Sequence, residues 1–129
     1  MCFTLSGVNA SQSSKEDYYP IVKDIKKHMN TYDGRISLDE YNDIDDTYVV
    51  SFFDDDNNHY FFDLSKSDMN EYTEGNLSDW EKKTIGNHEG YYQETHDAKI
   101  FRYNVCDDIY LCIRVSPDVN LDYHVLYSG

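Results

Sequence analysis

The sequence predicts an α+β fold, in which an antiparallel sheet of about five to seven strands is packed on one side by one longer N-terminal helix and one short helix. Three observations support this prediction. Apolar residues recur at helical spacing near the N-terminus, two aromatic-rich segments flank an Asp/Asn turn, and apolar and polar residues alternate through the last third. With 129 residues, the chain is expected to form a single globular domain, residues 1–129.

The longer helix is expected at about residues 15–29. Overlapping capping signals precede this segment, and Pro20 lies near its start, where the missing N–H has no partner to lose. The apolar residues recur at i, i+4, i+7 and i+11, which places them on one helical face: Tyr18, Val22, Ile25 and Met29.

A β-hairpin is expected at Tyr48–Leu64, because β-branched and aromatic residues form both arms and Asp54–Asn58 supplies turn chemistry. The preceding Asp39–Asp46 is expected to be an acidic loop. Further strands are expected at Cys2–Leu5, Arg35–Leu38, Tyr91–Thr95, Lys99–Cys106, Ile109–Ser116 and Leu121–Tyr127.

The short helix is expected to begin near Ser78. A capping box, Ser78-x-x-Glu81, opens this segment, and Gly86 is well placed to end the helix after about Ile85.

The acidic residues are concentrated in one stretch. Asp39–Asp79 holds 13 of the 25 acids and a single base, Lys66, so its formal charge is −12 against −14 for the whole chain. Coulomb repulsion makes binding to nucleic acid or to an anionic membrane unfavourable and favours a basic partner.

The sequence suggests a cytoplasmic protein, in the host cytoplasm if a phage encodes it. No apolar run approaches the ~20 residues that cross a bilayer, and Met1–Gly7 lacks the features of a signal peptide. The cysteines, Cys2, Cys106 and Cys112, have no CxxC spacing and are expected to be reduced thiols. A tight turn after Cys106 disfavours a disulfide between Cys106 and Cys112.

No catalytic motif is present. The five histidines are scattered without a compact zinc spacing, and there is no nucleophile elbow, phosphate loop or dinucleotide-binding motif. Acidic neighbours would raise the pKa of the Cys106 thiol rather than activate it. We therefore expect no enzymatic activity and no cofactor or metal.

One segment resembles the second half of an EF-hand calcium loop. Asp33–Glu40 has Gly, Ile, Ser and Glu at the appropriate spacing. The first half lacks oxygen ligands, because Met29 and Thr31 stand at the first and third positions. An Asp-Gly turn is the simpler interpretation, and a calcium-binding module with a degenerate loop is an alternative.

The acidic stretch is interleaved with aromatic residues. A solvated surface is the simplest interpretation of the acids, but clustering them costs stability through repulsion, and ordinary surfaces mix both signs. Carboxylates and rings on a rigid hairpin can stand in for the phosphates and bases of nucleic acid. The expected partner-binding residues are Asp43, Asp45, Asp46, Asp54, Asp55, Asp56, Tyr60, Asp63, Asp68, Glu71 and Glu74.

In composition the chain resembles small phage or mobile-element proteins that disarm host defence, such as DNA mimics and anti-CRISPR proteins. This resemblance implies a non-enzymatic acidic inhibitor that binds a basic nucleic-acid-processing protein and blocks its nucleic-acid groove. An immunity protein that neutralises a basic toxin such as a nuclease is an alternative of equal fit. A structural or assembly protein with a solvated acidic face is a further one.

Overall fold

The computed structural model describes residues 15–31, 33–66, 80–106 and 108–121. The expected strand Cys2–Leu5, and all but the first residue of the expected strand Leu121–Tyr127, lie outside these ranges. The described elements are α1 (Lys15–Asn30), β1 (Arg35–Asn42), β2 (Thr47–Phe53), β3 (His59–Ser65), β4 (Glu81–Ile85), β5 (His88–Glu94), β6 (Lys99–Cys106) and β7 (Ile109–Val115).

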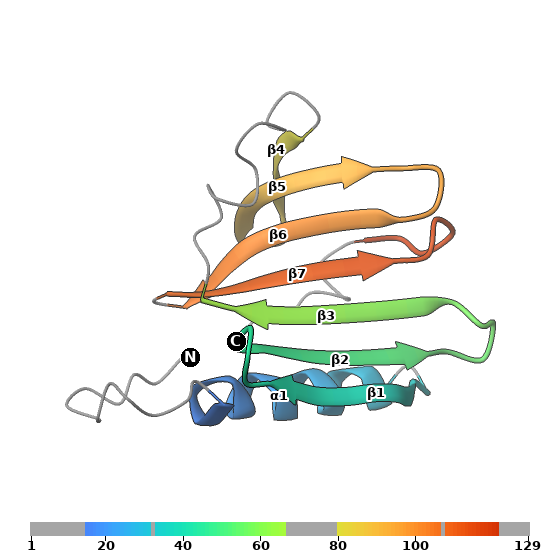
Figure 1. Ribbon diagram of the computed structural model, residues 1–129. Helices are drawn as coiled ribbons and strands as arrows, with labels where there is room; N and C mark the ends of the chain where they lie inside the picture. The colour runs from blue at the N-terminus through green and yellow to red at the C-terminus, as the bar shows by residue number, and fades with distance from the viewer. Residues whose placement is uncertain (1–14, 32, 67–79, 107, 122–129) are drawn as a thin grey trace.

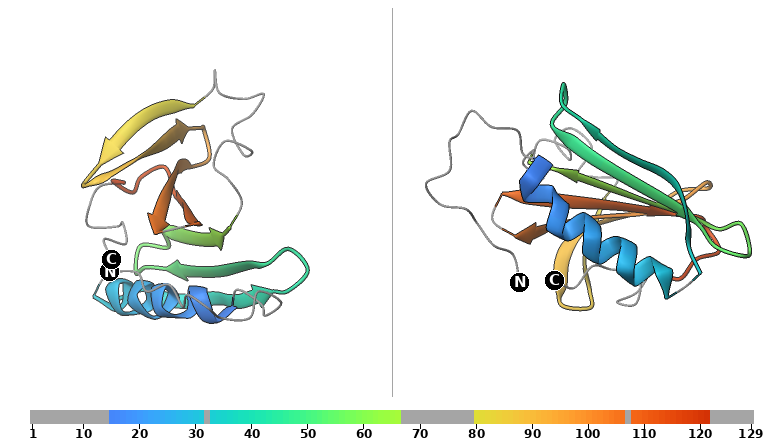
Figure 2. Two further views of the ribbon diagram at one scale, coloured as in Figure 1. Left: turned by 90° about the vertical axis from the view of Figure 1, so that its left-hand side faces the viewer. Right: turned by 90° about the horizontal axis from the view of Figure 1, so that it is seen from below.

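The strands form one antiparallel sheet of seven, in the order β1-β2-β3-β7-β6-β5-β4 (Figure 1). α1 runs across one face of the half formed by β1, β2 and β3, and the sheet twists strongly away from it toward β4 (Figure 2). The α+β class is therefore confirmed. The face that α1 covers is called the helix side below, and the opposite face is called the outer face.

The single described helix, α1, corresponds to the one expected at about residues 15–29. Glu16 and Asp17 lie in its first turn and Lys27 and His28 in its last, where each sign suits the helix dipole. The residues that it buries against the sheet lie on one helical face: Tyr18, Ile21, Val22, Ile25 and Met29.

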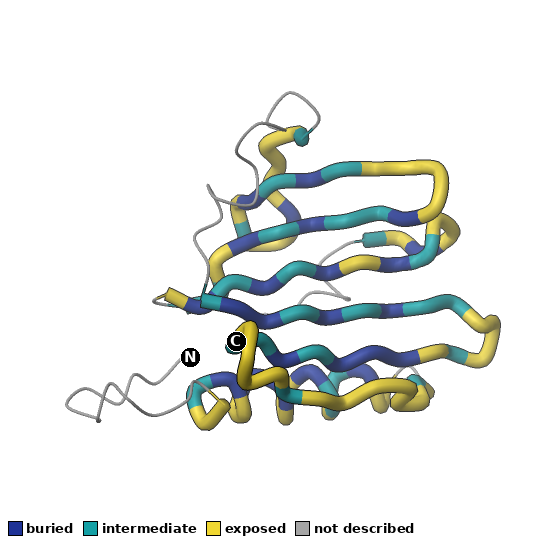
Figure 3. The backbone as a smooth tube through the Cα atoms, in the orientation of Figure 1, coloured by how far each residue is buried: buried dark blue, intermediate teal, exposed yellow. Residues whose placement is uncertain are grey.

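The core lies between α1 and the helix side of the sheet. Alternate residues of each strand are buried, as the bands along the strands in Figure 3 show. Burying each large apolar side chain contributes about 1.5–3 kcal/mol, so these alternate positions supply most of the driving force for folding. On the central strands they are Tyr48, Val50 and Phe52 on β2, Tyr60, Phe62 and Leu64 on β3, and Leu111, Ile113 and Val115 on β7.

The expected hairpin Tyr48–Leu64 is confirmed as β2 and β3. Phe53 pairs with His59 at its closed end, and Asn57 takes a positive φ of 63° in the turn. Asparagine tolerates this left-handed conformation better than most residues, so the Asp/Asn run supplies the turn that its composition predicts.

The expected short helix is wrong. Glu81–Ile85 is strand β4, which pairs with β5 around a two-residue turn at Gly86-Asn87. Gly86 has a positive φ of 62°, a conformation that suits a helix end and a hairpin turn alike. Pairing with β5 satisfies the backbone hydrogen bonds of Glu81–Ile85, so Gly86 forms a hairpin turn rather than a helix end. Ser78, the expected start of the helix, lies outside the described residues.

The acidic loop expected at Asp39–Asp46 is shorter than predicted. Residues 39–42 continue β1, with Asp39 paired to Val50 and Asn42 to Thr47. Only residues 43–46 form the turn between β1 and β2. Pairing with a strongly apolar β2 therefore extends an acidic segment whose own composition disfavours a strand.

The expectation that all cysteines are reduced is wrong for Cys106, which is disulfide-bonded, whereas Cys112 is a free thiol. Cys106 and Cys112 are therefore not paired with each other, as expected.

Candidate protein-interaction site

The turn between β1 and β2 is held in place from both sides. The Asn42 side-chain oxygen accepts hydrogen bonds from the backbone N–H groups of Ile44 and Asp45, at 2.9 and 3.2 Å. On the other side, the Tyr41 hydroxyl donates to the Asp46 carboxylate at 2.7 Å, and the Tyr18 hydroxyl donates to the Asp46 carbonyl at 2.7 Å. The turn therefore presents its acids in a fixed arrangement.

Ile44 lies within this turn and is 90% exposed. Asp43 and Asp45 flank it and are also exposed. An apolar side chain between two carboxylates offers a partner both a hydrophobic contact and a charged one.

Acids from three separate segments converge on Lys66, at the end of β3. Its ammonium donates to Asp17 at 2.7 Å. Burial lowers the pKa of Lys66, but the bond to Asp17 and the charges of Asp108 and Asp46 outweigh it and raise that pKa. One lysine therefore lies among carboxylates from α1, the β1–β2 turn and the β6–β7 turn.

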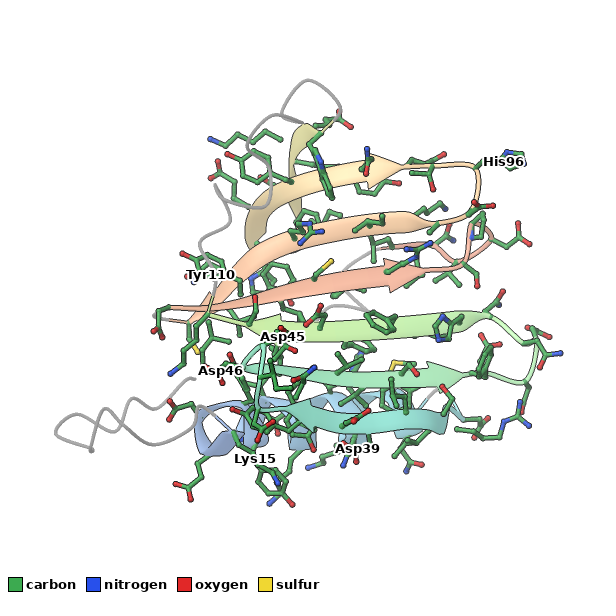
Figure 4. All side chains as sticks on the ribbon, viewed as in Figure 1. Lys15, Asp39, Asp45, Asp46, His96 and Tyr110 are labelled. Carbon is green, nitrogen blue, oxygen red and sulfur yellow. The ribbon has the colours of Figure 1, made fainter. Side chains whose placement is uncertain are left out.

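We call this region the acidic end. Figure 4 shows Asp45 and Asp46 at this end of the sheet, and His96 at the opposite end. The acidic end is defined as Glu16, Asp17, Asp43, Asp45, Asp46 and Asp108.

The second acidic turn lies at the other end of β2. Residues 54–58 connect β2 to β3, so the seven residues of β2 separate Asp54 from the β1–β2 turn. At about 3.3 Å per residue, this separation is roughly 23 Å. The expected single contact surface is therefore divided into two.

Asp54 and Tyr60 stabilise this second turn. The Asp54 carboxylate accepts from the backbone N–H groups of Asp56 and Asn58, from the Asn58 side chain and from the Tyr60 hydroxyl. Burial raises the pKa of Asp54, but these hydrogen bonds outweigh it and lower that pKa. Tyr60 is only 7% exposed, whereas Asp55 and Asp56 are exposed.

The remaining expected contact residues are dispersed. Asp63 lies on the outer face near the middle of β3, and Asp68, Glu71 and Glu74 lie outside the described residues. Asp39 is also engaged internally, because it accepts from Lys26 at 2.5 Å and from the Tyr48 hydroxyl at 2.7 Å. Among the expected residues, Asp43 and Asp45 are exposed in the β1–β2 turn, and Asp55 and Asp56 are exposed in the β2–β3 turn. Asp17 and Asp108 enlarge the acidic set at the first of these two ends.

The segment that resembles a calcium loop does not have EF-hand geometry. Arg35–Asn42 is extended as β1, whereas an EF-hand loop curls around the ion and leads into a second helix. Within the described residues, no three His, Cys, Asp or Glu side chains are grouped closely enough to hold a metal ion. Asp33 has a positive φ of 57°, in keeping with the Asp-Gly turn.

The outer face holds a cluster of residues that the sequence did not single out. Register places Val49, Asp63, Cys112, Arg102 and Tyr91 side by side in one row across five strands. Burial is the largest influence on two of them. It raises the pKa of Asp63 to about 6, against the opposing charge of Arg102, and raises that of Cys112 to about 11.

Trp80 extends this cluster, because the Arg102 guanidinium lies over its ring at 5.1 Å from the centroid. In the sequence, this cluster corresponds to the strand positions that alternate with the core residues and therefore face outward. These positions are normally polar and solvated in a sheet that is covered on one side. Their aromatic character here could have drawn attention to the face.

Comparison with protein-family models, with curated proteins and with solved structures gave no match. Among the described residues, no helix has the length and apolar character needed to cross a membrane.

Proposed function

We propose that this protein is a non-enzymatic inhibitor that binds a basic nucleic-acid-processing protein through its acidic end and blocks the nucleic-acid groove. The observation that carries the proposal is the convergence of Asp17, Asp46 and Asp108 around one lysine. These residues are remote in the sequence, and the fold brings them together in spite of their mutual repulsion.

The physical basis is electrostatic complementarity. A groove that binds phosphates attracts carboxylates by the same field, and the attraction speeds association more than it strengthens the final complex. The braced β1–β2 turn loses little conformational freedom on binding, and Ile44 adds apolar contact area. Binding should therefore be fast and should slow as the salt concentration rises.

The proposed contact set differs from the expected one. Asp43, Asp45 and Asp46 stay in it, and Asp17, Ile44 and Asp108 join it. The residues of the other turn leave it because they lie at the opposite end of β2: Asp54, Asp55, Asp56 and Tyr60. Asp63 leaves it because it lies on the outer face.

The test uses two variants with the same change of charge. Asp43→Asn with Asp108→Asn removes two charges from the acidic end, and Asp55→Asn with Asp56→Asn removes two charges from the other turn; all four residues are exposed. Immobilised wild-type protein captures basic proteins from a lysate at 50 mM NaCl. Each captured nucleic-acid-binding protein is then titrated with the inhibitor against a labelled DNA duplex.

We expect the inhibitor to displace the duplex, and the acidic-end variant to bind about tenfold more weakly, a loss of about 1.4 kcal/mol. The control variant should change affinity less than twofold. Equal weakening by both variants would contradict a specific role for the acidic end. A ternary complex of partner, duplex and inhibitor would contradict the blocking of the groove.

A further inference from the structure

The outer face of the central strands has the composition of a protein interface. Residues that alternate with the core on β2, β3, β7, β6 and β5 include four aromatic residues and two arginines, but no lysine. The cores of protein interfaces are enriched in aromatic residues and arginine and depleted in lysine and acids. The outward positions that carry this signal are Phe53, Phe61, Tyr91, Tyr110, Arg102 and Arg114.

The face is poor in acids although the chain is rich in them. Among its outward positions on these five strands, only Asp63 and Glu89 are acidic, which matches the two arginines in number. The acids of the described residues are instead concentrated in the turns at both ends of the sheet, such as Asp43–Asp46 and Asp54–Asp56. The face is therefore nearly neutral and is not suited to a strongly basic partner.

The charges on this face are complementary to one another across a two-fold axis. Asp63 Oδ1 is buried and has no hydrogen-bond partner among the described residues. Arg114 is exposed and lies on the neighbouring strand β7, where it pairs with Phe61, two residues before Asp63 on β3. A two-fold axis near this point would bring the exposed Arg114 guanidinium of each copy over the Asp63 position of the other, where its charge adds to that of Arg102, which already opposes the Asp63 carboxylate from the same chain.

The size of the face is sufficient for a stable contact. Five strands at about 4.8 Å spacing and seven residues at about 3.3 Å give a flat area of roughly 24 by 23 Å. This product is about 550 Å². β1 and β4 extend the same face at its two edges and bring it toward the ~800 Å² per partner of a typical specific interface. Aromatic contacts already order part of this surface, with Phe53 and His59 ring centroids 4.8 Å apart.

We propose that the outer face is the interface of a homodimer, in which two copies of this chain pack sheet against sheet about a two-fold axis near Asp63 and Arg114. Such aligned packing of twisted sheets is common within single domains. The dimer leaves the acidic ends, which lie at the margin of the sheet, available for another partner. This inference is independent of the proposed inhibitor function, because it concerns a different surface.

Sedimentation equilibrium of the full chain tests the proposal, at 50 and 500 mM NaCl. We expect a monomer–dimer equilibrium that becomes tighter at the higher salt concentration, because salt screens the repulsion between two chains of charge −14. Binding through the acidic end has the opposite salt dependence, so failure of one proposal is distinguishable from failure of the other.

Two matched pairs of variants locate the interface. Arg114→Glu should raise the dimer dissociation constant at least tenfold, whereas Lys27→Glu, the same change at an exposed position of α1, should change it less than threefold. Leu38 and Ile36 are 39% and 53% exposed, on opposite faces of β1. Leu38→Glu should weaken the dimer more than Ile36→Glu does.

Three results would overturn the proposal. One is a monomer at 200 μM protein and both salt concentrations, and another is equal weakening by the two members of each pair. The third is binding of a labelled 15-nucleotide oligouridine that Arg114→Glu abolishes, which would make the aromatic face a stacking platform for single-stranded RNA. Circular dichroism spectra of all four variants check that each one folds.

Discussion

The Asp63 carboxyl group is partly buried, and its charged form lowers the stability of the folded protein. It lies on the outer face between Val49 and Cys112, where burial raises its pKa to about 6 from an ordinary value of 3.8. The folded protein therefore binds a proton at Asp63 more tightly than the unfolded chain does. Its contribution favours folding below about pH 4 and is lost as the pH rises through 6.

Asp63→Asn tests this linkage. In the monomer, at protein concentrations too low for a dimer, the neutral amide avoids the cost of burying a carboxylate, so the variant should be more stable than the wild type at pH 7.5, by about 2 kcal/mol. Near pH 4, where the wild-type carboxyl is protonated in the folded state, the two proteins should differ little. Urea unfolding at both pH values measures the difference, and Asp55→Asn, at an exposed turn position, should show no such change.

Gly90 shows a different constraint at a single residue. It lies on the helix side of β5, opposite Tyr103. A Cβ at this position would lie 2.2 Å from the Arg102 carbonyl oxygen and 2.9 Å from the Tyr103 Cβ. Only glycine lets β5 and β6 approach this closely.

Gly90→Ala should therefore destabilise the protein by about 1–3 kcal/mol, because the two strands must move apart. The exposed Thr84 on β4 provides the control, and Thr84→Ala should change the free energy of unfolding by less than about 0.5 kcal/mol. Chemical denaturation measures both. An alanine variant as stable as the wild type would show that β5 and β6 adjust without cost.

At the scale of elements, the β2–β3 hairpin depends on one turn residue. The Asp54 carboxylate accepts hydrogen bonds from two backbone N–H groups, an amide and a hydroxyl, while its backbone N–H and carbonyl bond to Asn58 and Asn57. The hairpin is therefore closed by side-chain and backbone bonds together.

Asp54→Ala should destabilise the protein by about 2 kcal/mol, because several turn donors lose their acceptor. Asp54→Asn keeps one carbonyl oxygen and should fall between the wild type and the alanine variant. Asp55→Ala changes the neighbouring exposed residue and should be nearly neutral. Thermal unfolding followed by circular dichroism ranks the three, and a different order would contradict this role of Asp54.

At the scale of the whole molecule, the net charge of −14 opposes folding through self-repulsion. The acidic end should contribute, because it gathers six carboxylates and Lys66 is bonded to one of them, Asp17. Neutralising exposed acids of the acidic end should raise the free energy of unfolding. This gain should disappear at high salt concentration, because salt screens the repulsion that the substitutions relieve.

Asp43→Asn with Asp108→Asn should therefore raise the free energy of unfolding by about 0.5–1 kcal/mol at 20 mM NaCl and by much less at 500 mM. Lys66→Gln should act in the opposite direction, because it removes the cation bonded to Asp17. Urea unfolding at the two salt concentrations measures both effects. If the double variant were no more stable at low salt, repulsion at the acidic end would be negligible.

Elements with local sequence signals could be predicted from the amino-acid sequence. Apolar residues at helical spacing mark α1, and alternating residues around Asp54–Asn58 mark the β2–β3 hairpin. The boundaries of β6 were predicted correctly as Lys99–Cys106 because its alternation is strong and turns lie at both ends. Local periodicity and turn chemistry need no knowledge of distant partners.

Other features of the fold depend on contacts between segments that are distant in the sequence. Glu81–Ile85 became β4 because β5 offered a partner for its backbone, and Asp39–Asn42 joined β1 because β2 did the same. The strands also separated the contiguous acids into two ends and placed Asp63 beside Cys112, from a segment almost fifty residues later. The strands that pair are those whose pairing buries the shared core, and no single segment contains that information.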